Sequence, residues 1–153
     1  MASATDVTVV ERELVIDASP ETVWELLVDP ARATSWMGQQ SWSEPHEGGL
    51  YRVEVIPGHI ARGEFIELDA PRKLVLSWGW EGENAVPAGS SRLEFTLTPE
   101  GDGTRLHFVH SGLPSAESAA SHAHGWDHYL ERLAIVAPGG DAGEDPWLSG
   151  EMS

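Results

Sequence analysis

The fold of this chain depends on one stretch near its C-terminus, Ser115–Val136, which reads SAESAASHAHGWDHYLERLAIV. It follows Pro114 and opens with a serine that can cap free backbone N–H groups, and the run Pro138-Gly139-Gly140 ends it. The stretch is therefore predicted to be one long helix. At about 1.5 Å per residue, it is roughly 30 Å long, the width of a small domain.

One face of this helix is apolar and needs a partner surface. Helical spacing places six residues on that face: Ala119, His122, Trp126, Tyr129, Leu130 and Leu133. No strand pattern follows the helix, so this face can bury only against the segments before it. Those segments are mostly β-strands, and we expect a lone long helix that closes over a sheet.

A glycine stands directly before the central tryptophan of this helix. Gly125 costs about 1 kcal/mol of helix stability relative to alanine, which suggests that something approaches closely beside Trp126. We expect a strand backbone or an aromatic ring to cross the helix there, so that Gly125→Ala destabilises the protein through a clash. The alternative is that Gly125 faces solvent and is merely tolerated.

Six segments before the helix alternate apolar and polar residues with the period of a strand: Val7–Ile16, Leu50–Ile56, Ile60–Leu68, Lys73–Trp80, Arg92–Thr98 and Thr104–Ser111. The short connections between the later strands require antiparallel pairing. After the first strand, Ser19-Pro20 and Asp29-Pro30 each place a capping residue before a proline and predict two short helices, the second ending at about Trp36.

The expected fold class is therefore α+β. We expect a curved six-stranded antiparallel sheet with two short helices and one long C-terminal helix on its apolar face. A curved sheet and a straight helix touch well along only part of their length. The space left between them is a natural pocket.

The composition is that of one acidic domain. The 153 residues carry a formal charge of −16 and include no cysteine. The charge argues against nucleic acid or an anionic membrane as a partner, because phosphate binding needs clustered Lys and Arg. The lack of cysteine excludes disulfides, thiolate catalysis and cysteine metal sites.

We expect one domain over residues 7–137, between a disordered N-terminus (residues 1–6) and an acidic C-terminal tail (residues 138–153). The tail reads as loose apart from Trp147-Leu148, whose docking the sequence leaves open. The N-terminus has neither the basic region nor the apolar core of a secretory leader, and no stretch approaches the length of a membrane span. A cytoplasmic protein is the expectation.

Four local patterns, in this order, resemble a known family: Ala18–Trp24 (ASPETVW), Gly63–Leu74 (GEFIELDAPRKL), Gly103–Leu113 (GTRLHFVHSGL), and Gly125-Trp126 with Leu130 and Leu133. With the order of the elements, they resemble the helix-grip fold of the START/Bet v-like superfamily. Within it, they are similar to the bacterial family named after the C-terminal domain of the heat-shock chaperone ATPase activator. The resemblance covers about Val7 to Val136.

The resemblance implies a pocket for a small hydrophobic molecule. The superfamily includes lipid carriers, hormone receptors, polyketide cyclases and chaperone co-factors, and the fold does not choose among them. We favour a binder or carrier of a small apolar or aromatic molecule. An enzyme of the cyclase, dehydratase or hydrolase type is one alternative, and a chaperone-interacting domain is another. A chaperone partner is not expected, because the co-factor's separate N-terminal domain has no counterpart here; a homodimer stays open.

Histidines are the candidates for chemistry. His110 and His122 each lie on an otherwise apolar face, and they either orient a ligand or move a proton in the pocket, or are structural histidines bonded to their neighbours. No carboxylate is placed beside them, so no catalytic residue is assigned. His124 and His128 share a helical face at ligand-like spacing but lack an evident third ligand, so no metal and no cofactor are expected.

The seven tryptophans are many for this length. Trp78 and Trp80 share a strand face, and Trp36 and Trp42 lie near the expected pocket mouth. Such rings either fill the core or line the pocket with an indole N–H available to a ligand. The predicted ligand-binding residues are Trp36, Trp78, Trp80, Phe95, His110, His122, Trp126 and Leu130.

Overall fold

The computed structural model describes residues 8–82 and 85–149, so the expected disorder of residues 1–6 lies outside the described residues. The elements, in chain order, are β1 (Val10–Ile16), α1 (Pro20–Val28), α2 (Pro30–Ala33), β2 (Gln40–Ser41), β3 (Leu50–Ile56), β4 (His59–Asp69), β5 (Lys73–Trp78), β6 (Ser91–Glu100), β7 (Gly103–Ser111), α3 (Ala116–Val136) and the 3-10 helix η1 (Pro146–Ser149). The α+β class and the long C-terminal helix are confirmed.

The strands form one antiparallel sheet in the order β1-β7-β6-β5-β4-β3-β2. It has seven strands in the described part of the chain, one more than predicted. The added strand, β2, is two residues long and pairs Gln40 with Glu54 and Ser41 with Val53 at the sheet edge. Two residues are too few for an alternating pattern, which is why the sequence reads as a loop there.

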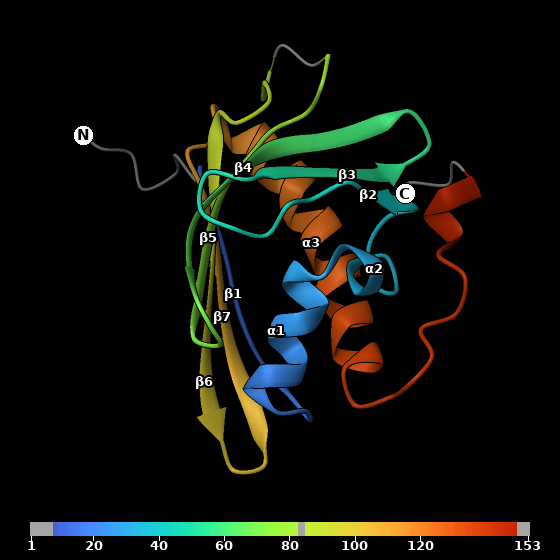
Figure 1. Cartoon of the computed structure of the whole chain (residues 1–153). Helices are drawn as coiled ribbons and strands as arrows, with labels where there is room; N and C mark the ends of the chain where they lie inside the picture. Colours follow the sequence, from blue (N-terminus) through green and yellow to red (C-terminus); the bar gives the residue numbers. More distant parts are fainter. Residues whose placement is uncertain (1–7, 83–84, 150–153) are drawn as a thin grey trace.

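The sheet bends around the helices. The pairing shifts register between β3 and β4 and again between β4 and β5, and such bulges increase strand twist. Gly63 lies in β4 two residues before the second shift, and a Cβ atom there would stand 1.8 Å from the Ser77 carbonyl oxygen, so only glycine fits. Figure 1 shows the result: β3 and β4 run across the top, while β6 and β7 run along one side.

All three α-helices lie on the concave side of this sheet (Figure 1). Helix α3 begins after Ser115, whose hydroxyl oxygen accepts from the Ser118 N–H. Its buried residues are Ala119, Trp126, Tyr129, Leu130 and Leu133, so the predicted apolar face is confirmed, with His122 half-buried beside it. Among the described residues, no helix is both long and apolar enough to cross a membrane.

The edge strand β1 is tied to α3 by an ion pair. The Arg12 guanidinium donates two hydrogen bonds to the Asp127 carboxylate, at 2.6 and 3.2 Å. The two short helices begin at the predicted caps, Ser19 and Asp29, but α2 ends at Ala33 rather than near Trp36. Trp36 instead donates its indole N–H to the Leu26 carbonyl and fixes the end of this turn to α1.

Candidate ligand-binding site

A pocket of about 300 Å³ lies between α3 and the bent end of the sheet. Helix α3 contributes every third or fourth residue along one stripe, from Ser118 to Tyr129, and the opposite wall comes from β3, β5 and the residues after them. The lining residues are Met37, Val55, Ile56, His59, Trp78, Trp80, Ala85, Val86, Ser118, Ser121, His122, Gly125, Trp126, Tyr129 and Trp147. The volume is at the small end of the range for ligand sites.

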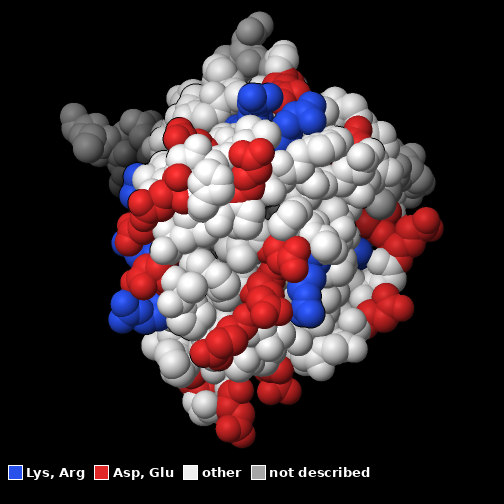
Figure 2. All heavy atoms as spheres, in the orientation of Figure 1, with Lys and Arg blue, Asp and Glu red and all other residues white. Residues whose placement is uncertain are grey.

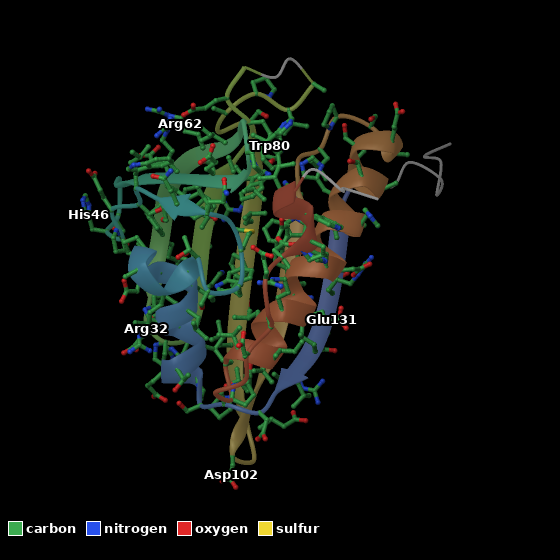
Figure 3. All side chains as sticks on the ribbon, turned by 90° about the vertical axis from the view of Figure 1, so that its right-hand side faces the viewer. Arg32, His46, Arg62, Trp80, Asp102 and Glu131 are labelled. Atoms are coloured by element: carbon green, nitrogen blue, oxygen red, sulfur yellow. The ribbon has the colours of Figure 1, made fainter. Side chains whose placement is uncertain are left out.

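The structure brings four predicted residues together in this wall: Trp78, Trp80, His122 and Trp126. Figure 3 shows Trp80 at the upper end of the sheet, near α3 and η1, whereas Arg32, His46, Arg62 and Glu131 lie at the periphery.

The other four predicted residues are Trp36, Phe95, His110 and Leu130, and they do not line the pocket. All four are buried in the core, at most 3% exposed. Phe95 packs against Phe108, for example, with ring centroids 5.1 Å apart. Strand and helix periodicity identifies buried residues but does not tell a packed position from one that borders a cavity.

Sequence reasoning missed several lining residues. Tyr129 belongs to the predicted apolar face of α3 and Trp147 to the predicted tail, and neither is among the predicted ligand-binding residues. His59 is the first residue of β4, just before the predicted strand, and Val86 lies in the connection between β5 and β6, where no periodic pattern exists to reveal its direction. For Tyr129, the signal was present: it lies one helical turn from Trp126 on the same face.

The expectation for Gly125 is wrong. No strand or ring crosses the helix there, since a Cβ atom at Gly125 would meet nothing within 4 Å. Gly125 does not simply face solvent either, because it lines the pocket. The missing side chain leaves space in the cavity rather than room for a crossing backbone.

A continuous hydrogen-bond chain runs behind the pocket wall. The Trp126 indole N–H donates to His110 Nδ1 at 3.0 Å, so the ring proton of His110 is on Nε2. His110 Nε2–H then donates to Ser91 Oγ at 2.8 Å, and the Ser91 hydroxyl donates to the Trp78 carbonyl oxygen at 2.8 Å. Every polar atom of the buried His110 side chain therefore has a partner.

His122 is held in the opposite tautomer. Its Nε2 accepts from the Trp80 indole N–H at 3.0 Å, and its Nδ1–H donates to the Ser118 carbonyl oxygen at 2.8 Å. The His122 ring lies edge-on to the His110 ring, with centroids 4.9 Å apart. We name these five residues the inner cluster: Trp78, Trp80, His110, His122 and Trp126.

Both histidines of the inner cluster are neutral. Burial, and then the neighbouring His122, lowers the pKa of His110 to about 3. Burial also lowers the pKa of His122, against the opposing effect of its bond to the Ser118 carbonyl. Since both nitrogens of each ring already have protein partners, neither ring has a free lone pair or proton for general acid–base catalysis.

Two polar groups in the pocket wall are unpaired. The Trp78 indole N–H and the Tyr129 hydroxyl are covered from solvent and have no hydrogen-bond partner among the described residues. Burial raises the pKa of Tyr129, and the nearby Asp145 carboxylate, as a charge and as an acceptor, raises it further, so the hydroxyl keeps its proton. Asp145 Oδ2 is itself buried and unpaired among the described residues, so it competes with a ligand for the Tyr129 hydroxyl, whereas the Trp78 N–H has no such neighbour among the unpaired atoms. Both groups are thus potential donors, and a buried donor without a partner costs about 1–3 kcal/mol.

A second group of tryptophan and histidine contacts lies on the outer side of α3. Trp147 of η1 stacks on His128, with ring centroids 3.8 Å apart, and on His124 at 5.3 Å. His128 Nε2 lies 2.8 Å from Oδ1 of Asp145, whose side chain is only 4% exposed. We name these four residues the outer cluster: His124, His128, Asp145 and Trp147. The paired histidines thus hold a tryptophan of the tail, whose docking the sequence left open.

A bent antiparallel sheet that grips one long helix, with an aromatic pocket between them, defines a helix-grip domain. A family model described as "Activator of Hsp90 ATPase homolog 1-like protein" matches residues 17–137, and the chain belongs to this family. The family resemblance stated from the sequence is therefore confirmed. A search of curated proteins found no match.

Solved structures agree with this assignment. An AHSA1-like protein of Rhizobium etli is 47% identical and superimposes with a TM-score of 0.73 over 91% of this chain and 87% of its own. CalU16 from Micromonospora echinospora is 27% identical, with a TM-score of 0.71 over 94% and 82% of the two chains. An Aha1 dimer from Colwellia psychrerythraea has a TM-score of 0.74 over 86% and 97%, and at 18% identity it shows the fold alone.

Proposed function

We propose that this protein binds a small, uncharged and largely apolar molecule, an aromatic ring system that carries a hydrogen-bond acceptor, in the pocket between α3 and the sheet.

 The observation that carries the proposal is a cavity of about 300 Å³ whose aromatic walls contain the unpaired Trp78 N–H and, beside the Asp145 carboxylate, the unpaired Tyr129 hydroxyl. A ligand oxygen that reached either donor would supply the missing hydrogen bond.

The charge of the site supports an uncharged ligand. Among the described residues that line the pocket, none is Lys, Arg, Asp or Glu. The whole chain carries a formal charge of −16, and Figure 2 shows acidic side chains spread over the face it presents. An anionic ligand would meet a repulsive field outside and no cation inside, so neutral molecules are favoured.

The pocket histidines favour binding over catalysis. An enzyme that used His110 or His122 as an acid or base would need a ring nitrogen free to meet the substrate. The hydrogen bonds to Trp126, Ser91, Trp80 and the Ser118 carbonyl engage all four ring nitrogens. The cyclase, dehydratase or hydrolase alternative, as based on these two histidines, therefore loses both of its proton carriers.

Native mass spectrometry of freshly purified protein tests the proposal directly. We expect a retained small molecule or, after its removal, stoichiometric binding of a neutral fluorescent probe, N-phenyl-1-naphthylamine. Gly125→Leu is the blocking variant, because its side chain extends into the cavity from a position where nothing lies within 4 Å. A folded Gly125→Leu protein that binds the probe as tightly as wild type would contradict the proposed site.

Two variants test the acceptor, of which Tyr129→Phe is near-isosteric. Tyr129→Phe removes only the unpaired hydroxyl, and Trp78→Phe removes the indole N–H while keeping an aromatic ring. We expect both variants to weaken the binding of a ligand that carries a carbonyl oxygen more than the binding of its hydrocarbon analogue. Equal losses for the two ligands would show that neither donor contacts the ligand.

The family description favours a second candidate, interaction with an Hsp90-type chaperone. The test is the ATPase rate of such a chaperone with and without this protein. A rise in that rate that survives Gly125→Leu would assign the activity to the outer surface rather than to the pocket.

A further inference from the structure

The C-terminal segment, residues 141–149, packs beside α3 although it lies outside the region that the family model matches, residues 17–137. Figure 3 shows η1 against the side of α3. Through Trp147, this segment supplies one of the rings that line the pocket. The site therefore contains a residue that the family domain itself does not provide.

Trp147 is as well buried as a core residue. Its side chain is 6% exposed, its ring stacks on His128 at an interplanar angle of 12°, and it meets Tyr129 edge-on at 5.6 Å between centroids. Tyr129 is the pocket residue with the unpaired hydroxyl. Trp147 thus forms a wall of the cavity next to the Tyr129 hydroxyl.

The segment is anchored by side-chain contacts. Asp145 Oδ1 lies 2.8 Å from His128 Nε2 and accepts from the Trp147 backbone N–H at 3.0 Å. The Arg132 guanidinium donates to the carbonyl oxygens of Ala142 and Gly143, at 3.2 and 2.9 Å. These anchors hold the segment to the surface of one helix, whereas a strand ladder holds the opposite wall, so the segment opens at a lower free energy than the sheet.

We propose that residues 141–149 are the outer wall of the binding site, that Trp147 contacts the ligand, and that the ligand enters and leaves by displacing this segment. The inference rests on the proposed function, because it names the part of the same pocket that controls exchange. Trp147 is a specificity-determining residue in this scheme: its ring limits the width of the cavity beside Tyr129.

Stopped-flow measurement of N-phenyl-1-naphthylamine release tests the inference. The variants are Trp147→Ala, Trp147→Phe and a chain that ends at Gly140. The matched control is Trp42→Ala, since Trp42 is 40% exposed and does not line the pocket. We expect the release rate to rise at least tenfold for Trp147→Ala and for the shortened chain, less for Trp147→Phe, and not at all for Trp42→Ala.

Hydrogen exchange of the wild-type protein supplies a second readout. Bound probe should slow amide exchange in residues 141–149 at least threefold. If the shortened chain fails to fold by circular dichroism, the two Trp147 variants decide the matter.

The outcomes separate the two proposals. If wild type binds the probe but the Trp147 variants release it at an unchanged rate, residues 141–149 are not the outer wall of the site. The proposed function would not be affected by that result. Tighter binding by Trp147→Ala would also overturn the outer wall, because the segment would then obstruct the pocket rather than complete it. No probe binding by wild type would overturn both.

Discussion

The inner and outer clusters both combine tryptophan with histidine, on two sides of one helix, but their histidines have different partners. In the inner cluster, indole N–H groups donate to neutral histidines, and no carboxylate is among the partners of His110 or His122. In the outer cluster, an indole ring stacks on histidines, and His128 is bonded to the buried carboxylate of Asp145.

The difference follows from what lies opposite each face of α3. The inner face meets the sheet, where burial lowers the pKa of both histidines and hydrogen bonds select their tautomers. The outer face meets the short segment 141–149, which includes the Asp145 carboxylate that bonds to His128. We infer that the inner cluster stabilises the whole fold, while the outer cluster holds only the wall of the site.

The largest expected effect is that of Trp126→Ala. Trp126 packs on Phe108 at 4.7 Å and on Trp78 at 5.1 Å between ring centroids, and it holds His110 by a hydrogen bond. Its loss should lower the free energy of unfolding by about 3–5 kcal/mol in urea denaturation. A loss below about 1 kcal/mol would show that the inner cluster does not stabilise the fold.

The second prediction is an acid dependence that belongs to the inner cluster. The pKa of His110 is about 3 in the folded protein against 6.5 for a free side chain, so only the unfolded chain binds a proton between these values. Stability is therefore full above about pH 6.5 and falls as the pH decreases toward 3, by about 1.4 kcal/mol per unit.

His110→Gln is the matched variant, because glutamine offers both an acceptor and a donor without titrating. Urea denaturation at pH 7 and pH 4.5 should show wild type losing about 3 kcal/mol more than the variant over this interval. Equal slopes for the two proteins would mean that His110 takes up its proton in the folded state.

The third prediction concerns the outer cluster. Asp145→Ala removes the acceptor of both the Trp147 N–H and the His128 ring. The segment should undock, with faster proteolysis and hydrogen exchange after Gly140, while the free energy of unfolding falls by about 1 kcal/mol. A global loss as large as that of Trp126→Ala would erase the distinction between the clusters.

The smallest expected effect has the opposite sign. Gly125→Ala adds a methyl group where nothing lies within 4 Å, so the gain in helix propensity should raise the free energy of unfolding by up to about 1 kcal/mol. Ala120→Gly, at an exposed position of the same helix, should lower it by a similar amount. A destabilised Gly125→Ala protein would be evidence that another segment crosses the helix closely at Gly125, contrary to the structure.

Much of the fold was predictable because its signals are local. The length of α3, its Ser115 cap and its buried face follow from helical spacing, and the caps of α1 and α2 follow from Ser19 and Asp29. The two-residue strand β2 was not predictable, since its pairing depends on the edge that β3 presents.

The candidate site was predictable only in part. Trp36 and Trp80 look alike in the sequence, yet one is bonded to the Leu26 carbonyl in the core and the other lines the pocket. Trp147 lies in an acidic tail with no periodic pattern, and its docking depends on His124, His128 and Arg132 across from it.

The sequence by itself determined the helix-grip architecture, the apolar face of α3 and the acidic charge of the chain. Only the tertiary structure decided which aromatic rings border the cavity, that His110 and His122 are neutral, and that the tail completes a wall. The physical reason is that periodicity and capping act between neighbours in the chain. A cavity, a tautomer and a lowered pKa depend instead on the groups that folding brings from the opposite side.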